Sequence, residues 1–120
     1  FASDEICFTA VRMSDHLHAK AIVAMTKSGF TGFRVASYRP EANVFIFTDN
    51  KKLLATLNLV WGVRGFYYDK FVSTDDTFQD VVDMLKAEGM VKQGEYVINC
   101  ASMPIHKKQR TNTIKVTQVE

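Results

Sequence analysis

The chain has 120 residues, 47% of them hydrophobic, and its 15 basic and 13 acidic residues give a formal net charge of +2. This length predicts a single domain, and the hydrophobic share is large enough for a packed core, which excludes an intrinsically disordered chain. The near balance of charge gives no reason to expect a nucleic-acid partner. No apolar run reaches the ~18 residues that a membrane span needs, so no membrane partner is expected.

The first half of the chain is predicted to begin with a helix and then to alternate strands with further helices. Ser3 or Asp4 can cap the first helix, and Pro40 stops the second one. Short apolar runs without polar alternation indicate strands that are buried on both faces. The predicted helices cover residues 4–17 and 31–38, and the predicted strands cover residues 21–25 and 43–48.

The second half continues the alternation and then ends on two strands. Asp49 and Asn50 can cap a short helix that runs through Leu57. Ser73 or Thr74 can cap a long amphipathic helix that ends at Gly89. The predicted strands of this half cover residues 62–68, 95–100 and 113–119.

This order of elements predicts an α/β fold, a three-layer αβα sandwich in which helices cover both faces of a five-stranded sheet. The sheet should be mixed and mostly parallel. No helix lies between the last two strands, so the last one is predicted to be antiparallel, at an edge, and joined by the loop 101–112. Residues 1–120 are read as a single domain. The start at Phe1, without an initiator Met, suggests a domain excised from a longer chain.

Residues 26–32, TKSGFTG, directly follow the first predicted strand, at the edge where open parallel sheets bind ligands. Amides at the start of a helix are unpaired and suit an anion, and Gly29 allows a ligand to approach closely. The stretch is neither a P-loop nor a dinucleotide fingerprint. A strand-to-helix turn also needs Ser and Gly, so a phosphate site and a plain turn both remain open. The candidate side chains are those of Thr26, Lys27, Ser28 and Thr31.

A second polar concentration lies in residues 104–112, where Lys107, Lys108 and Arg110 place three positive charges within four residues. A solvated basic loop is one interpretation. The other is a second wall of a phosphate site, because this loop follows a strand that should end at the same edge as the first strand. Charge-assisted hydrogen bonds would then hold a small phosphorylated metabolite.

The remaining candidates point away from catalysis. His16 and His18 are two residues apart at a helix end and face different directions, which argues against a metal pair. Cys7 and Cys100 are interpreted as buried reduced thiols of a cytoplasmic protein rather than a disulfide. The sequence shows no nucleophile with a base and no metal-ligand spacing. It therefore favours a binding or assembly domain, with no catalytic residue, metal or cofactor of its own.

Five segments carry motifs that occur together, and in this order, in one known family. They are HAKAIVAMTKSGFT at 18–31, YRP at 38–40, LxLxWGV at 57–63, GE followed by VI at 94–98, and TNT followed by Val at 111–116. In this combination the chain resembles the C-terminal, allosteric and oligomerisation domain of bacterial-type pyruvate kinase. The resemblance covers nearly the whole chain.

The resemblance implies the regulatory and subunit-assembly domain of a glycolytic, cytoplasmic phosphotransferase. In the full enzyme a catalytic barrel transfers a phosphoryl group from phosphoenolpyruvate to ADP with Mg²⁺ and K⁺. None of the barrel's catalytic or metal-binding residues matches this sequence, so the domain alone is expected to be catalytically silent. The resemblance also implies a homo-oligomer, a tetramer in the full enzyme, with one interface between C-terminal domains.

The resemblance further implies a site for an allosteric sugar phosphate, commonly fructose 1,6-bisphosphate. Phe30 departs from the Arg that the family often has there, and the lysine-rich loop replaces glycines that usually close over the sugar. A monophosphate, or substitute clamping by the basic side chains, is therefore our hypothesis. The implied phosphate-binding residues are Thr26, Lys27, Ser28, Thr31, the amides of Gly29 and Phe30, and the substitute clamps Lys107, Lys108 and Arg110.

Two other functions remain open at this point. One is a free-standing sugar-phosphate- or nucleotide-binding module. The other is an assembly domain whose phosphate loop is a relic.

Overall fold

The structure is a computed structural model that describes residues 2–26, 28–57, 59, 62–70, 74–102 and 111–120. Helices and strands alternate along the chain until the last two strands, as predicted. The helices are α1 (Ala2–Leu17), α2 (Phe30–Ser37), α3 (Lys51–Leu57) and α4 (Thr74–Ala87). The strands are β1 (Ala21–Met25), β2 (Asn43–Thr48), β3 (Val63–Tyr67), β4 (Tyr96–Ala101) and β5 (Thr113–Gln118). Within the described residues, no helix is both long and apolar enough to cross a membrane.

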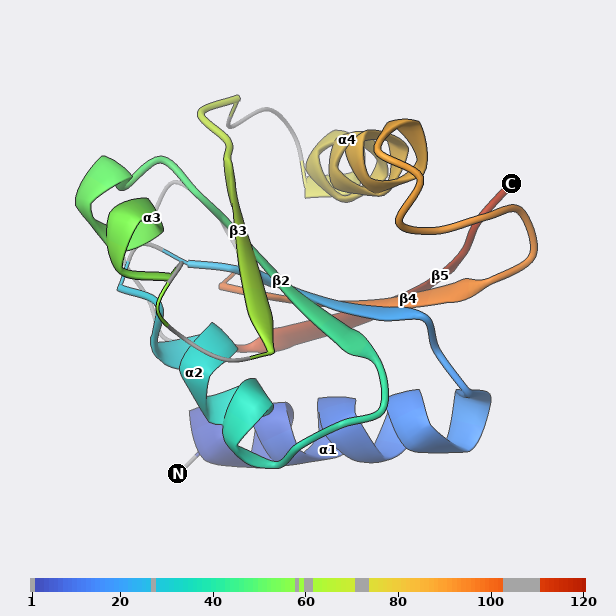
Figure 1. The fold of residues 1–120 in the computed structure, drawn as a ribbon. Helices are drawn as coiled ribbons and strands as arrows, with labels where there is room; N and C mark the ends of the chain where they lie inside the picture. The colour runs from blue at the N-terminus through green and yellow to red at the C-terminus, as the bar shows by residue number, and fades with distance from the viewer. Residues whose placement is uncertain (1, 27, 58, 60–61, 71–73, 103–110) are drawn as a thin grey trace.

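The strands form one mixed sheet in the order β3-β2-β1-β4-β5. β1 pairs in parallel with β2 and β4, and β2 pairs in parallel with β3. β5 is antiparallel to β4 and lies at the edge. The predicted fold class and the predicted direction of the last strand are therefore confirmed. Because β1 and β4 run in the same direction, their carboxyl ends meet at one edge of the sheet (Figure 1).

The helices cover both faces of this sheet. Figure 1 shows α1 and α2 on one side of it and α4 on the other. Successive residues of β1 follow this division, since Ile22 belongs to the cluster under α1 and α2 while Val23 belongs to the cluster under α4. Leu53 and Leu57 of α3 pack against Ala24 and Ile46, in a smaller cluster. The fold is thus the three-layer sandwich that the sequence predicts.

Local signals in the sequence explain where several elements begin and end. The Oδ1 of Asn50 accepts a hydrogen bond of 3.1 Å from the amide of Leu53, which is the predicted cap of α3. Gly89 adopts a φ of 75° just after α4. Thr74 is the first residue of α4 rather than its cap, because the helix already begins there. The alternative cap, Ser73, lies outside the described residues.

Candidate anion-binding site at the carboxyl edge of the sheet

The loop between β1 and α2 turns sharply at Gly29. This residue caps α2 with a φ of 84° and a ψ of −7°, a left-handed conformation that L side chains rarely adopt. A Cβ at this position would lie 2.7 Å from a ring carbon of Phe33 and 2.8 Å from a methyl carbon of Leu53. Both the conformation and the available space therefore require glycine, which the sequence pattern had indicated for a different reason, close approach to a ligand.

The backbone amides of the loop already have partners within it. The amide of Gly29 donates to the Oγ1 of Thr26 at 3.1 Å, and the amide of Phe30 donates to the Oγ of Ser28 at 3.2 Å. Because both hydroxyl oxygens act as acceptors in these bonds, each hydroxyl can still donate its own hydrogen to an anion. The sequence predicts that the amides of Gly29 and Phe30 help to bind a phosphate group. In the structure these two amides donate to the neighbouring hydroxyl oxygens, so the hydroxyls of Thr26 and Ser28 are the groups that can donate to an anion.

The first turn of α2 adds donors beside this loop. Gly29 is the N-cap residue of α2, and no side chain accepts a hydrogen bond from the first amides of the helix as a cap. The helical hydrogen bonds begin with the amide of Phe33, which donates to the carbonyl of Gly29 at 3.0 Å. The amides of Thr31 and Gly32 therefore precede the hydrogen-bonded part of the helix, where the partial positive charge of its dipole lies.

The end of the loop that follows β4 reaches the same place. The Oγ1 of Thr31 is hydrogen-bonded to the Oγ1 of Thr111, although the two residues are 80 positions apart. Both residues are buried, with exposed fractions of 4% and 6%. The next residue, Asn112, donates its amide to the carbonyl of Ala101 at 3.1 Å. The first turn of α2 and the end of the loop that follows β4 are thus in direct contact.

The predicted site residues divide into two groups. Thr26, Ser28, Gly29, Phe30 and Thr31 follow one another around the turn; Ser28 is exposed and Phe30 is 49% exposed. The basic candidates lie outside the described residues. They are Lys27, Lys107, Lys108 and Arg110.

The neighbouring part of the same edge carries acidic side chains as well as a lysine. Desolvation, followed by the nearby charges of Asp69 and Asp49, raises the pKa of Tyr67 above its usual value. These two carboxylates follow β3 and β2, on the far side of β1 from β4. The Nζ of Lys51 lies 5.7 Å from the centroid of the Tyr67 ring, so a cation accompanies these two carboxylates on this side of the edge.

Other reactive side chains are placed away from this edge or are buried. Cys7 and Cys100 are both buried and free of a disulfide, as expected. Burial raises the pKa of both thiols, to about 12 for Cys100. A protonated, buried thiol is a poor nucleophile. Among the described residues, no three His, Cys, Asp or Glu side chains gather closely enough to hold a metal ion.

The sequence did not predict the hydrogen bond between Thr111 and Thr31. The position of Thr111 within the TNT motif marked a family resemblance but no role. The available signal was the predicted parallel pairing of the strands before the two loops, because it brings the loops together. Which side chains of the two loops touch depends on the register of these strands. In the structure Ala24 of β1 lies opposite Cys100 of β4.

The sequence and the structure were compared with known proteins. The family profile described as "Pyruvate kinase, alpha/beta domain" matches residues 4–117. The pyruvate kinase of Clostridium acetobutylicum is 36% identical over 118 residues, which is 98% of this chain and 25% of that relative. The pyruvate kinase of Lactobacillus delbrueckii subsp. bulgaricus is 34% identical over 108 residues, which is 90% of this chain and 18% of that relative.

A solved structure shows the same fold. The crystal structure of a pyruvate kinase from Cryptosporidium parvum superposes with a TM-score of 0.85 over 100% of this chain and 23% of that chain, at 19% sequence identity. At this identity the likeness concerns the fold alone. The chain spans a quarter or less of the length of each of these three relatives.

Proposed function

The chain belongs to the family of the pyruvate kinase alpha/beta domain, and we propose that it is a regulatory and subunit-assembly domain that binds a phosphorylated effector at the loop of residues 26–31. The observation that carries this proposal is the contact between Thr31, in the first turn of α2, and Thr111, at the carboxyl edge of β1 and β4. It brings hydroxyls, the first amides of α2 and the end of a basic sequence segment to one place. Such a place suits a phosphate group.

The proposal extends to the enzyme to which such a domain belongs. Its relatives are named pyruvate kinases, so the proposed overall activity is phosphoryl transfer from phosphoenolpyruvate to ADP, with Mg²⁺ and K⁺, in the cytoplasm. The sequence shows no nucleophile with a base. The proposed contribution of this chain is therefore to bind the effector and to join subunits, while the transfer itself belongs to a catalytic barrel.

The ligand chemistry follows from the residues of the loop. The hydroxyls of Thr26, Ser28 and Thr31 can donate to phosphate oxygens, and Lys27 and the basic segment 107–110 supply positive charge by sequence. Sugar monophosphates and bisphosphates are the proposed class.

Calorimetric titration of the 120-residue chain at low salt tests this site directly. The titrants are inorganic phosphate, glucose 6-phosphate and fructose 1,6-bisphosphate. We expect heat from at least one sugar phosphate. We also expect Gly29→Ala to weaken its binding about tenfold or more, because the new methyl group displaces the loop that carries the donors, and charge-assisted hydrogen bonds are worth about 1.5–3 kcal/mol.

Gly94→Ala is the matched control. Gly94 also has a positive φ, of 88°, but nothing lies within 4 Å of an added Cβ. This variant carries the conformational cost without the collision, at a position before β4, and should bind like the wild type. The absence of heat with all three titrants would contradict the effector proposal and leave a relic loop. Equal loss in both glycine variants would show that general destabilisation, and not the loop, controls binding.

A second proposed role, assembly, has its own support. Phe8 of α1 and Tyr38 after α2 are 42% and 37% exposed, and their rings form an edge-on pair with centroids 5.5 Å apart. Adjacent exposed aromatic side chains are typical of protein interfaces. This role needs no ligand, so it stands independently of the phosphate site.

A further inference from the structure

Thr111 lies beside the proposed phosphate site without being one of its predicted ligands. Its hydroxyl meets that of Thr31, and both residues are almost completely buried. We propose that Thr111 is a positioning residue of this site, which acts through Thr31 to align a hydroxyl donor with a bound phosphate group. This inference rests on the proposed effector function.

The number of hydrogens available to the pair supports this role. Each threonine hydroxyl has one hydrogen to donate and two lone pairs to accept with. When no anion is bound, either hydroxyl can be the donor in the bond between them. A phosphate oxygen beside Thr31 accepts only. Thr31 must then donate to the phosphate group, and Thr111 must donate to Thr31. The anion therefore fixes the direction of the whole chain of hydrogen bonds, and each bond in such a chain strengthens the next.

The backbone around Thr111 explains why it can hold Thr31 in place. Asn112 is tied to the end of β4 through its amide, 3.1 Å from the carbonyl of Ala101. Thr113 begins β5, and its hydroxyl donates to the Oδ1 of Asn112 at 2.8 Å. Thr111 thus lies two residues before a paired strand.

Thr31 is fixed from the other side. It lies in the first turn of α2, directly after the turn that Gly29 imposes. A hydroxyl held between two ordered elements loses less conformational freedom when an anion binds than a free side chain does. The backbone of Thr31 is thus held by α2, and the direction of its hydroxyl is set by Thr111.

Two substitutions separate the hydroxyl of Thr111 from its shape. Thr111→Val keeps the volume and removes the hydroxyl, whereas Thr111→Ser keeps the hydroxyl. We expect Thr111→Val to weaken the binding of fructose 1,6-bisphosphate and of inorganic phosphate about fivefold, and Thr111→Ser to stay within about twofold of the wild type. Dissociation constants from calorimetry and melting temperatures are measured for every variant.

A double-mutant cycle distinguishes a role in the site from a structural contact. In a Thr31→Val background, Thr111→Val should cause no further loss of phosphate affinity, because its effect passes through the Thr31 hydroxyl. If Thr111→Val lowers the melting temperature and leaves both dissociation constants unchanged, the contact only joins the two loops and the inference is wrong. Equal losses of affinity in the presence and absence of the Thr31 hydroxyl would also overturn it.

The Gly29→Ala variant separates this inference from the proposed function. If the wild-type chain binds none of the three titrants, the effector site and the role of Thr111 both fall. If the wild type binds, Gly29→Ala weakens binding and Thr111→Val does not, the effector site stands and only the role of Thr111 is lost.

Discussion

At the scale of single residues, burial changes the proton affinity of Tyr68 and Cys100. Burial, and next the hydrogen bond from the Tyr68 hydroxyl to Asp80 at 3.0 Å, raise the pKa of Tyr68 to about 12. Burial, with a smaller effect of Cys7, raises the pKa of Cys100 to about 12. Both groups hold their protons more tightly in the folded state than in the unfolded state. They stabilise the fold below their unfolded pKa values, and this stabilisation is lost as the pH rises to about 12.

Replacing Tyr68 by Phe tests this linkage. The free energy of unfolding of the wild type should fall between about pH 9 and about pH 12, because the unfolded thiol and phenol ionise first. Tyr68→Phe should be about 1 kcal/mol less stable at pH 7, through loss of the hydrogen bond to Asp80, and should fall less steeply above pH 10. Urea unfolding followed at several pH values measures both effects. A variant curve parallel to that of the wild type above pH 10 would contradict the assignment.

At the residue scale, the sequence selects the residues of the candidate site but does not show which of their groups pair with one another. A local pattern of hydroxyls and glycine after a strand was enough to select residues 26–31. It could not show that Thr26 and Ser28 accept from the amides of Gly29 and Phe30, because that depends on side-chain rotamers. The bond to Thr111 joins residues 80 positions apart, so only the strand pairing of the whole sheet determines it.

At the scale of elements, the sequence predicts the limits of β1 and β2 more accurately than those of α2. The limits of β1 and β2 match the predicted ranges because turn-forming or capping residues bound each apolar run. α2 begins one residue earlier than predicted, at Phe30, because Gly29 takes the cap. The central place of β1 in the sheet could not be read from chain order, since strand order depends on which neighbours each strand pairs with.

Close packing between α2 and β2 leads to a prediction about Gly32. A Cβ at Gly32 would collide with the end of the Ile46 side chain. Alanine is a better helix former than glycine by about 1 kcal/mol, so propensity alone predicts that Gly32→Ala stabilises the chain. We expect the opposite, a loss of about 1–3 kcal/mol in the free energy of unfolding, because the crowded core must shift. Urea denaturation measures the sign directly.

The double variant Gly32→Ala/Ile46→Ala is the control for this collision. Ile46→Ala removes the clashing atoms and on its own should cost about 2–5 kcal/mol, since Ile46 is fully buried. With both changes present, the added methyl group fills part of the space that isoleucine leaves. The total loss should therefore be smaller than the sum of the two single losses. Strict additivity would show that the two positions do not compete for space.

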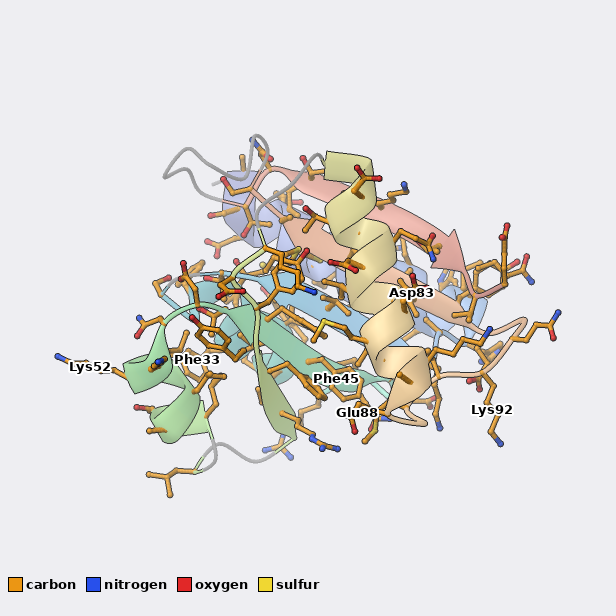
Figure 2. All side chains as sticks on the ribbon, turned by 90° about the horizontal axis from the view of Figure 1, so that it is seen from above. Phe33, Phe45, Lys52, Asp83, Glu88 and Lys92 are labelled. Atoms are coloured by element: carbon orange, nitrogen blue, oxygen red, sulfur yellow. The ribbon has the colours of Figure 1, made fainter. Side chains whose placement is uncertain are left out.

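At the scale of the whole molecule, the two faces of the sheet are covered unequally. Among the described residues, α1, α2 and α3 pack on one face, whereas α4 packs on the other. Figure 2 looks onto the α4 face and shows the labelled Phe45 between α4 and β3. Phe45, Phe47 and Phe66 fill this region with ring contacts of 5.9 and 5.1 Å between centroids. The exposed aromatic pair of Phe8 and Tyr38 lies at α1 and α2, on the other side of the molecule.

The exposed aromatic pair predicts self-association of the chain. Sedimentation velocity should detect a dimer at micromolar concentrations, and Phe8→Glu should weaken it at least tenfold, because a charge would be buried in the interface. Tyr67→Lys is the control, since Tyr67 is also 42% exposed but belongs to edge strand β3. A wild-type chain that remains monomeric at about 100 μM, well above the dissociation constants of standard interfaces, would remove this support for the assembly role.

The bond between Thr31 and Thr111 also has a consequence for the order of folding. The two hydroxyls meet only after a loop of 80 residues has closed, and that closure carries a large entropic cost that the paired strands must first offset. α2 and its turn can form from neighbouring residues, but their partner arrives with β4 and β5, near the end of the sequence. We therefore expect the candidate site to form late in folding. A chain truncated before β4 would retain the motif TKSGFTG and lose the place that the motif helps to build.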